Sequence, residues 1–232
     1  MEFPRLLLAA LTAMALCSAP TVNAQQPVKI RVSWVAPVSN WGSIWLEKKD
    51  LARHLGKSYV LEATRFAGTP PMVTAMASGE LEVANFAYST LGIAIKNAGM
   101  DDLRVIAHEF RDGAAGHYSQ EYLALADGPV KSLADLKGKV IATNAAGSAV
   151  DIAMRAMLRK SGLEDKRDYT VVEAPFPTMK AMLAQKKADL ATFVPPFAFD
   201  PELRQIGRLL FEQKEAVGTP QMTVWVVRKG FL

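Results

Sequence analysis

YLALADGPVKSLADLKGKVIATNAAGSAVDIAMRAMLRKSGL, residues 122–163, is the stretch that decides the fold. It contains an apolar strand (YLALA), a turn at Pro129, a second apolar strand (VIAT), a small polar loop (NAAGS) and an amphipathic helix. At the carboxyl end of a strand in an open α/β sheet, such a loop places backbone N–H groups and short hydroxyl side chains where ligands bind. The stretch carries no obvious nucleophile, metal cluster or phosphate loop. It therefore predicts a site that holds a small molecule without transforming it.

The chain before this stretch alternates strands and helices in the same way. Residues 28–34 have the period-two pattern of a strand. Further strands are predicted at residues 59–66, 81–87 and 103–110. Helices are predicted between them after Gly42, through Leu46, Leu51 and Leu55, and at residues 70–78 and 90–98, the second of the three with Thr69 as its N-cap. This alternation is typical of a parallel, doubly wound sheet.

A weak internal repeat follows from the same pattern. Residues 75–86 and 181–193 each read as the end of a helix followed by a short strand that finishes at a phenylalanine. The repeat indicates either two lobes of similar topology or the general likeness of any two helix–strand units. The glycine-rich residues 112–116 lie between the two copies and are the candidate crossover.

Composition limits the class of protein. The 232 residues are 50% hydrophobic and 22% charged, which predicts a globular chain of one or two domains. The net charge is only +4, and the lysines are dispersed without the interleaved aromatic residues of a nucleic-acid site. We therefore expect no nucleic-acid partner.

The N-terminus has the pattern of a secretory signal peptide over residues 1–24. Arg5 precedes an apolar run from Leu6 to Leu16, and small or polar residues lead to Ala24. A buried N-terminal helix is the alternative reading. Removal of this segment would also remove Cys17, the only cysteine, which excludes disulfides, cysteine-ligated metals and cysteine nucleophiles from the mature chain. No later segment is apolar for long enough to span a membrane, so we expect an exported, soluble, periplasmic protein.

Five predicted loops should gather at the carboxyl ends of the strands. They are residues 39–42, 68–71, 88–90, 144–148, and 175–178 with 193–197 beside it. In the fourth loop, Ser148 and Asp151 form a predicted capping box, so Ser148 is either a cap alone or a cap that also contacts a ligand. The aromatic residues Trp41, Tyr88, Phe176 and Phe197 are either walls of an apolar pocket or ordinary core residues.

Signatures of an enzyme are mostly missing. The three histidines lack the spacing of metal ligands, and neither G-x-S-x-G nor G-x-x-x-x-G-K-[ST] occurs. Arg65, Arg111 and His117 could meet an anionic group from the lobe edges, or could be surface residues.

The stretch that opens at residue 122 also resembles a known group of proteins. Its SLADLKGK segment, together with PPMVTAMASGELEVANF (residues 70–86) and MKAMLAQKKADLATFVPPF (residues 179–197), is similar to the periplasmic substrate-binding proteins of ABC importers, in particular to the nitrate, sulfonate and taurine branch. The resemblance implies a type II periplasmic-binding-protein fold, with two doubly wound α/β lobes, a hinge and a ligand cleft between the lobes. Lobe 1 would comprise residues 25–113, lobe 2 residues 114–222, and residues 223–232 a strand that returns to lobe 1. The helices with which relatives complete lobe 1 are not expected in this sequence.

The resemblance further implies a function and a site. The protein would capture a small solute, expected to be a sulfonate-, nitrate- or carboxylate-like anion, and deliver it as a monomer to an ABC permease and its ATPase, without catalysis, cofactor or metal. A periplasmic enzyme on the same fold, such as a dehydratase, and a ligand-sensing partner of a membrane receptor are the alternatives. The implied ligand-binding residues are Ser39, Asn40, Trp41, Thr69, Tyr88, Ser89, Asn144 and Ser148, with Phe176 and Phe197 as walls.

Overall fold

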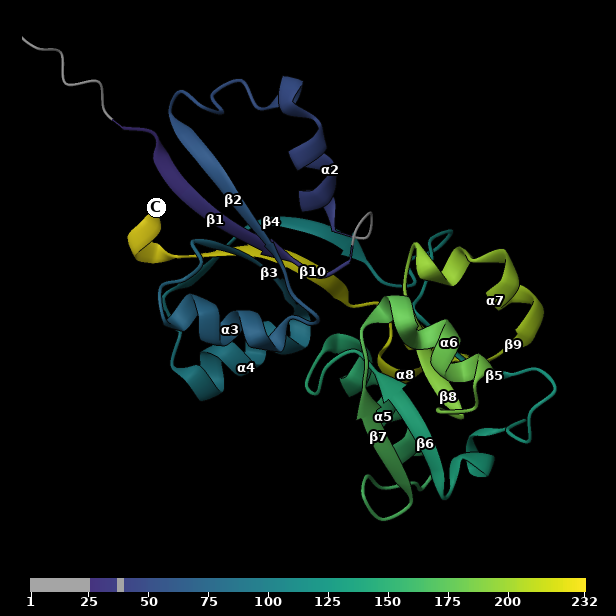
Figure 1. The fold of residues 1–232 in the computed structure, drawn as a ribbon. Coiled ribbons are helices and arrows are strands. Elements are labelled where there is room, and N and C mark those ends of the chain that lie inside the picture. Colours follow the sequence, from purple (N-terminus) through teal and green to yellow (C-terminus); the bar gives the residue numbers. More distant parts are fainter. Residues whose placement is uncertain (1–25, 37–39) are drawn as a thin grey trace, which may run out of the picture.

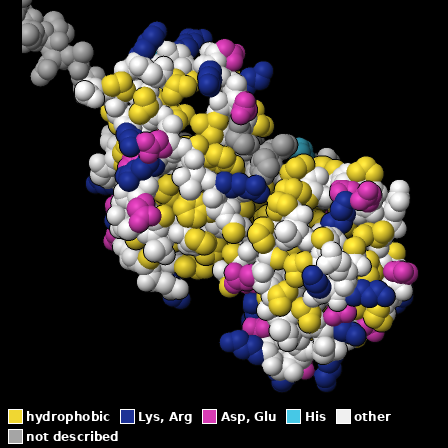
Figure 2. Space-filling view, in the orientation of Figure 1, with side chains coloured by type: hydrophobic (Ala, Val, Ile, Leu, Met, Phe, Trp, Pro, Cys, Tyr) yellow, Lys and Arg dark blue, Asp and Glu magenta, His cyan; other side chains and the backbone are white. Residues whose placement is uncertain are grey.

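A computed structural model describes residues 26–36 and 40–232. The predicted signal peptide and Ser39 lie outside the described residues, and so does the side chain of Trp41. Two bodies that meet at a narrower middle make up the molecule (Figures 1 and 2). We call the body that contains the first strand lobe 1 and the other body lobe 2.

Each lobe is built on one five-stranded sheet. In lobe 1 the strands lie side by side in the order β2 (Tyr59–Arg65), β1 (Val28–Trp34), β3 (Val83–Ala87), β10 (Gln221–Arg228) and β4 (Leu103–Arg111). In lobe 2 the order is β7 (Tyr169–Glu173), β6 (Lys139–Thr143), β8 (Leu190–Phe193), β5 (Glu121–Leu125) and β9 (Gly207–Glu212). The two orders are equivalent, and the two halves of the internal repeat end at β3 and β8, which hold the same position. The interpretation of the repeat as two lobes of similar topology is confirmed.

The sheets are mixed. The four strands predicted between residues 28 and 110 run parallel to one another, as expected, and one further strand in each lobe runs against its neighbours. Strand β1 is parallel to β2 and β3, and β6 is parallel to β7 and β8. Strand β10 runs antiparallel to β3 and β4, and β5 runs antiparallel to β8 and β9. Both exceptional strands are entered from the other lobe, at the edge where their neighbours end, and so they run in the opposite direction.

Helices cover both faces of each sheet. In lobe 1, α3 (Pro70–Ala77) and α4 (Tyr88–Ala98) pack on one face, and α2 (Trp41–Glu47) lies on the other (Figure 1). Lobe 2 contains α5 (Ala149–Lys160), α6 (Met179–Ala184), α7 (Pro201–Ile206) and α8 (Gln213–Val217). Short 3₁₀ turns occupy Lys49–Leu51, Leu133–Leu136, Phe176–Thr178, Phe197–Phe199 and Lys229–Phe231.

Two predicted helix boundaries are wrong. The helix expected to reach Leu55 ends at Glu47, because a step of five positions from Leu46 to Leu51 places these two side chains on different faces of a helix. Helix α4 begins at Tyr88 and not at Thr90.

The two lobes are joined by two chain segments that run beside each other, residues 112–120 and, after α8, residues 218–220. Asp112 fixes this hinge: its Oδ2 accepts from Ser119 Oγ at 2.7 Å, its Oδ1 accepts from the Gln120 amide at 2.9 Å, and its own amide donates to Pro220 O at 3.1 Å. Burial raises the pKa of Asp112, and the hydrogen bonds from Ser119 and Gln120 oppose that rise.

The core of lobe 2 shows how its sheet and helix are locked together. The rings of Tyr122 in β5 and Phe211 in β9 are stacked with their centroids 4.1 Å apart. The Tyr122 hydroxyl donates to Val150 O in α5 at 2.7 Å. A buried aromatic pair whose polar atom has a partner stabilises the interior without an unpaired group. Across residues 26–36 and 40–232, no helix is both long and apolar enough to cross a membrane.

The Leu190→Ala variant tests the core of lobe 2, because Leu190 in β8 is fully buried. Its free energy of unfolding should fall by about 2–5 kcal/mol, from lost burial and the cavity left behind. The matched control is Leu209→Ala in β9, where the side chain is 48% exposed and the change should stay within about 0.5 kcal/mol. Urea unfolding followed by circular dichroism measures both, and equal losses would contradict this account of the core.

Candidate functional site

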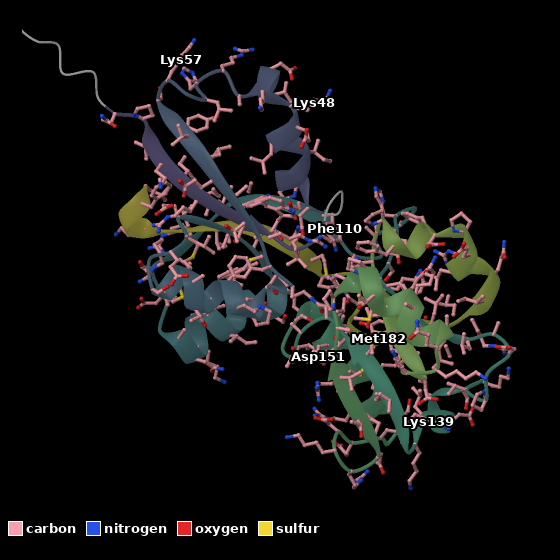
Figure 3. The ribbon with its side chains drawn as sticks, viewed as in Figure 1. Lys48, Lys57, Phe110, Lys139, Asp151 and Met182 are labelled. Atoms are coloured by element: carbon pink, nitrogen blue, oxygen red, sulfur yellow. The ribbon has the colours of Figure 1, made fainter. Side chains whose placement is uncertain are left out.

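A cavity of about 50 Å³ lies between the two lobes. Residues from both lobes line it, and the labelled Phe110 marks its position where the lobes meet (Figure 3). The described lining residues are apolar or polar and uncharged: Val35, Ala36, Asn40, Thr69, Asn85, Ala87, Phe110, Gln120, Asn144, Ser148, Ala149, Val150, Phe176, Val194, Met222 and Thr223. Such a mixture of apolar walls and a few polar groups is typical of a small-molecule site.

The topology explains why these residues meet. Strands β1, β3, β4, β6 and β8 end at the cleft, and their last residues or the loops that follow them reach the cavity. Because β5 and β10 run the other way, their amino ends meet the same edge. Gln120, Met222 and Thr223 enter the site for this reason.

Half of the predicted site residues line the cavity. These are Asn40, Thr69, Asn144, Ser148 and Phe176. Phe197 lies in a 3₁₀ turn and borders a separate surface depression with Phe199 and Lys180. Tyr88 and Ser89 are not lining residues; they link the lobes instead. A role in ligand binding stays a prediction for all of them.

Three hydrogen bonds close the cleft. The Tyr88 hydroxyl donates to Ala149 O at 3.3 Å, Ser89 Oγ donates to Gly147 O at 3.1 Å, and Asn144 Nδ2 donates to Ala67 O at 3.0 Å. Burial raises the pKa of Tyr88 to about 12, so its hydroxyl keeps its proton and remains a donor at neutral pH. The structure is therefore a closed state, with the lobes in direct contact.

Gly68 marks the tightest approach of the two lobes. A Cβ atom added there would lie 2.6 Å from Ala145 Cβ and 3.0 Å from Asn144 Nδ2. Only a residue without a side chain allows this contact, so the glycine sets how closely the lobes can approach.

A buried carboxylate organises the lobe 1 side of the cavity. Glu109 in β4 is 6% exposed, and its Oε2 accepts from Asn40 Nδ2 at 2.9 Å, Asn85 Nδ2 at 2.8 Å and Thr223 Oγ1 at 2.7 Å. Asn40 also donates to Asn85 Oδ1 at 3.0 Å, and its own Oδ1 accepts the amides of Val35 and Ala36. Glu109 thus holds three cavity residues from three different elements in fixed orientations.

The lobe 2 side is organised by the start of α5. Ser148 Oγ accepts from the Asp151 amide at 3.3 Å, but Asp151 Oδ2 accepts from the Gly147 amide at 2.9 Å and not from Ser148. The predicted capping box is therefore only half formed. The reason is that Arg155, one turn along, binds the Asp151 carboxylate at 2.9 Å and helps to hold it there. In α3, Thr69 does not cap through its side chain, because its hydroxyl pairs with that of Thr90 at 2.5 Å.

Several site residues were missed in the sequence for identifiable reasons. Gln120, Met222 and Thr223 precede or begin strands, and a parallel sheet would have placed them at its far edge. Asn85, Glu109 and Phe110 lie within strands. The usable signal was a polar residue in an otherwise apolar strand, since a buried polar group needs partners.

The chemistry available to the cavity is binding through neutral groups. None of the described lining side chains is titratable at neutral pH, and no cluster of His, Cys, Asp or Glu among the described residues could hold a metal ion. Hydroxyl and amide groups with apolar walls can orient a small molecule and exclude water around it.

Replacement of Glu109 tests the polar network. Glu109→Leu leaves three buried donors without their acceptor, and each such loss costs about 1–3 kcal/mol. Glu109→Gln keeps a carbonyl oxygen and should destabilise the protein by at least about 2 kcal/mol less. Chemical unfolding measures both variants, and equal destabilisation would show that the acceptor oxygen is not what matters.

Known structures share this architecture. The alkanesulfonate-binding protein SsuA from Xanthomonas axonopodis pv. citri bound to MOPS superposes with a TM-score of 0.70 at 20% identity, covering 90% of this chain and 68% of its own. The periplasmic aliphatic sulphonate binding protein SsuA from Escherichia coli gives 0.65 at 18% identity, over 88% and 66% of the two chains. The periplasmic nitrate-binding protein NrtA from Synechocystis PCC 6803 gives 0.66 at 14% identity, over 90% and 57%. The expected two-lobe α/β fold of periplasmic binding proteins is thereby confirmed, and the chain spans about two thirds or less of these relatives.

Sequence comparison agrees with the structure. No curated protein matches the sequence, but the profile of one family matches residues 23–232. This match covers nearly the whole chain, including every strand of both sheets. The protein belongs to the NMT1-like family.

Proposed function

We propose that this protein captures a small solute between its lobes and delivers it to the permease of an ABC importer. The observation that carries the proposal is the cavity lined from both lobes, closed by hydrogen bonds that cross the cleft. Likeness to binding proteins described for sulfonates and nitrate supports it. The chain would act outside the cytoplasm as a monomer, and without catalysis.

The closed geometry suggests how binding is coupled to shape. A solute in the cavity touches both lobes only when the cleft is shut, so its differential affinity shifts the population toward the closed state. The two hinge segments, tied together at Asp112, allow the lobes to move as units. A permease that recognises the closed form would then respond only to loaded protein.

The residues that line the cavity favour binding of a solute over catalysis on it. A general acid or base must reach the substrate, and the described lining side chains are uncharged amides, hydroxyls and apolar groups. Glu109 is not a lining residue, and its Oε2 already accepts three hydrogen bonds from cavity residues.

A thermal-shift and calorimetric screen tests solute capture. The panel contains alkanesulfonates, nitrate, phosphonates and carboxylates, together with small alcohols, amides and amines. A true ligand at one hundred times its Kd should stabilise the protein by about 2.7 kcal/mol. Steady consumption of a panel member, with no solute stabilising the protein, would replace this proposal with an enzymatic one. Stimulation of ATP hydrolysis by the reconstituted importer then separates import from sensing.

Gly68→Ala tests closure directly. The added methyl group would overlap Ala145 across the cleft, and overpacking of this kind costs about 1–3 kcal/mol. Solute affinity should fall by roughly tenfold or more, and small-angle scattering should show a larger radius of gyration without ligand. The stability of each lobe should change little, because opening relieves the overlap.

The matched control is Gly92→Ala in α4 of the same lobe. Apart from its chain neighbours and the backbone of its own helix, no described atom lies within 4 Å of a Cβ added there. Alanine in a helix interior is also more stable than glycine by roughly 0.5–1 kcal/mol. This variant should keep the affinity and the radius of gyration of the wild type. Equal effects of the two substitutions would contradict a role of Gly68 in closure.

A further inference from the structure

Gln120 presents an unpaired acceptor at the cavity. The residue lines the cavity and is 1% exposed, and its Oε1 has no hydrogen-bond partner among the described residues. A buried carbonyl oxygen without a donor is costly, and native proteins rarely keep one without a reason. A bound molecule that supplies the donor is such a reason.

The hinge fixes the direction in which this side chain points. The backbone N–H of Gln120 donates to Asp112 Oδ1 at 2.9 Å, and the backbone carbonyl of Gln120 accepts from the backbone N–H of Gln213 at 2.8 Å. The Gln120 side-chain amide also lies near the Asp112 carboxylate and lowers its pKa. An amide NH₂ group next to a carboxylate is favoured over an amide oxygen, which places Oε1 on the side away from Asp112.

Several neighbouring polar side chains in the cavity have already used their donors. Both amide hydrogens of Asn40 are taken by Asn85 Oδ1 and Glu109 Oε2. The single hydroxyl hydrogens of Thr223 and Ser148 go to Glu109 Oε2 and Asn144 Oδ1. No described lining residue carries a positive charge. The donors that remain for a solute on the lobe 2 side are the backbone amides of Ala149 and Val150 in the first turn of α5.

We propose that Gln120 determines specificity by accepting a hydrogen bond from the solute, and that the part of the solute beside Gln120 carries an N–H or O–H donor. The cavity is about 50 Å³ and is walled by Phe110, Phe176 and Met222. These dimensions suit a hydroxyl, amide or protonated amine on a compact apolar body. This inference rests on the proposed capture of a solute between the lobes.

Matched ligand pairs test it on the wild-type protein by calorimetry. Within each series the members differ in whether they carry an N–H or O–H donor: ethanesulfonate with 2-hydroxyethanesulfonate and 2-aminoethanesulfonate, and N,N-dimethylacetamide with acetamide. The member that carries the donor should bind at least tenfold more tightly in each series. Equal binding within pairs, or tightest binding of nitrate or of a donor-free sulfonate or phosphonate, would overturn the inference and leave solute capture standing.

Gln120→Met removes the acceptor at similar volume and should reduce the discrimination within each pair to about twofold or less. Gln205→Met in α7 is the control, because Gln205 is exposed and does not line the cavity. That variant should discriminate as the wild type does. Retained discrimination in Gln120→Met would contradict the role of Gln120, and a wild type that binds no panel member would remove both this inference and the proposed function.

Discussion

The chain passes twice between the lobes, and each passage delivers one strand into the interior of a sheet. Strand β5 lies between β8 and β9, and β10 lies between β3 and β4. Both strands are held by neighbours on two sides, so the lobes cannot separate without breaking a sheet. The two passages lie side by side and are joined at Asp112, which makes one flexible connection out of two segments. The cleft, the cavity and its closure all follow from this arrangement.

The polar side chains of the cavity are held in fixed orientations by hydrogen bonds to one another. In lobe 1, Asn40, Asn85 and Thr223 all donate to Glu109. Their donor hydrogens therefore point away from the cavity. In lobe 2, Ser148 and Asn144 pair with each other. A site whose side-chain donors are bonded within the protein is rigid, so little free energy is spent on reorganising it when a solute binds.

Much of the fold could be read from the sequence, because strand and helix periodicities are local properties. The segments around β1, β4 and α3 were predicted within a residue or two, and the repeat correctly indicated two similar lobes. No direction could be predicted for β5 and β10, since direction depends on where the chain comes from and not on a strand's own residues. Without that direction, Gln120, Met222 and Thr223 could not be assigned to the predicted site. Asn40, Thr69, Asn144, Ser148 and Phe176 were found because they follow strands whose direction was right.

The position of β10 has a consequence for how the molecule is assembled. Strand β4 pairs only with β10 among the described strands, and β10 follows all of lobe 2 in the chain. The strands of lobe 2, by contrast, are contiguous between residues 121 and 212. Lobe 2 can therefore complete its sheet from one continuous segment of the chain. Strand β4 must instead pair with a strand more than one hundred residues away. Closing so long a loop is slow, which makes the first lobe the last part to mature and the part that most needs protection until then.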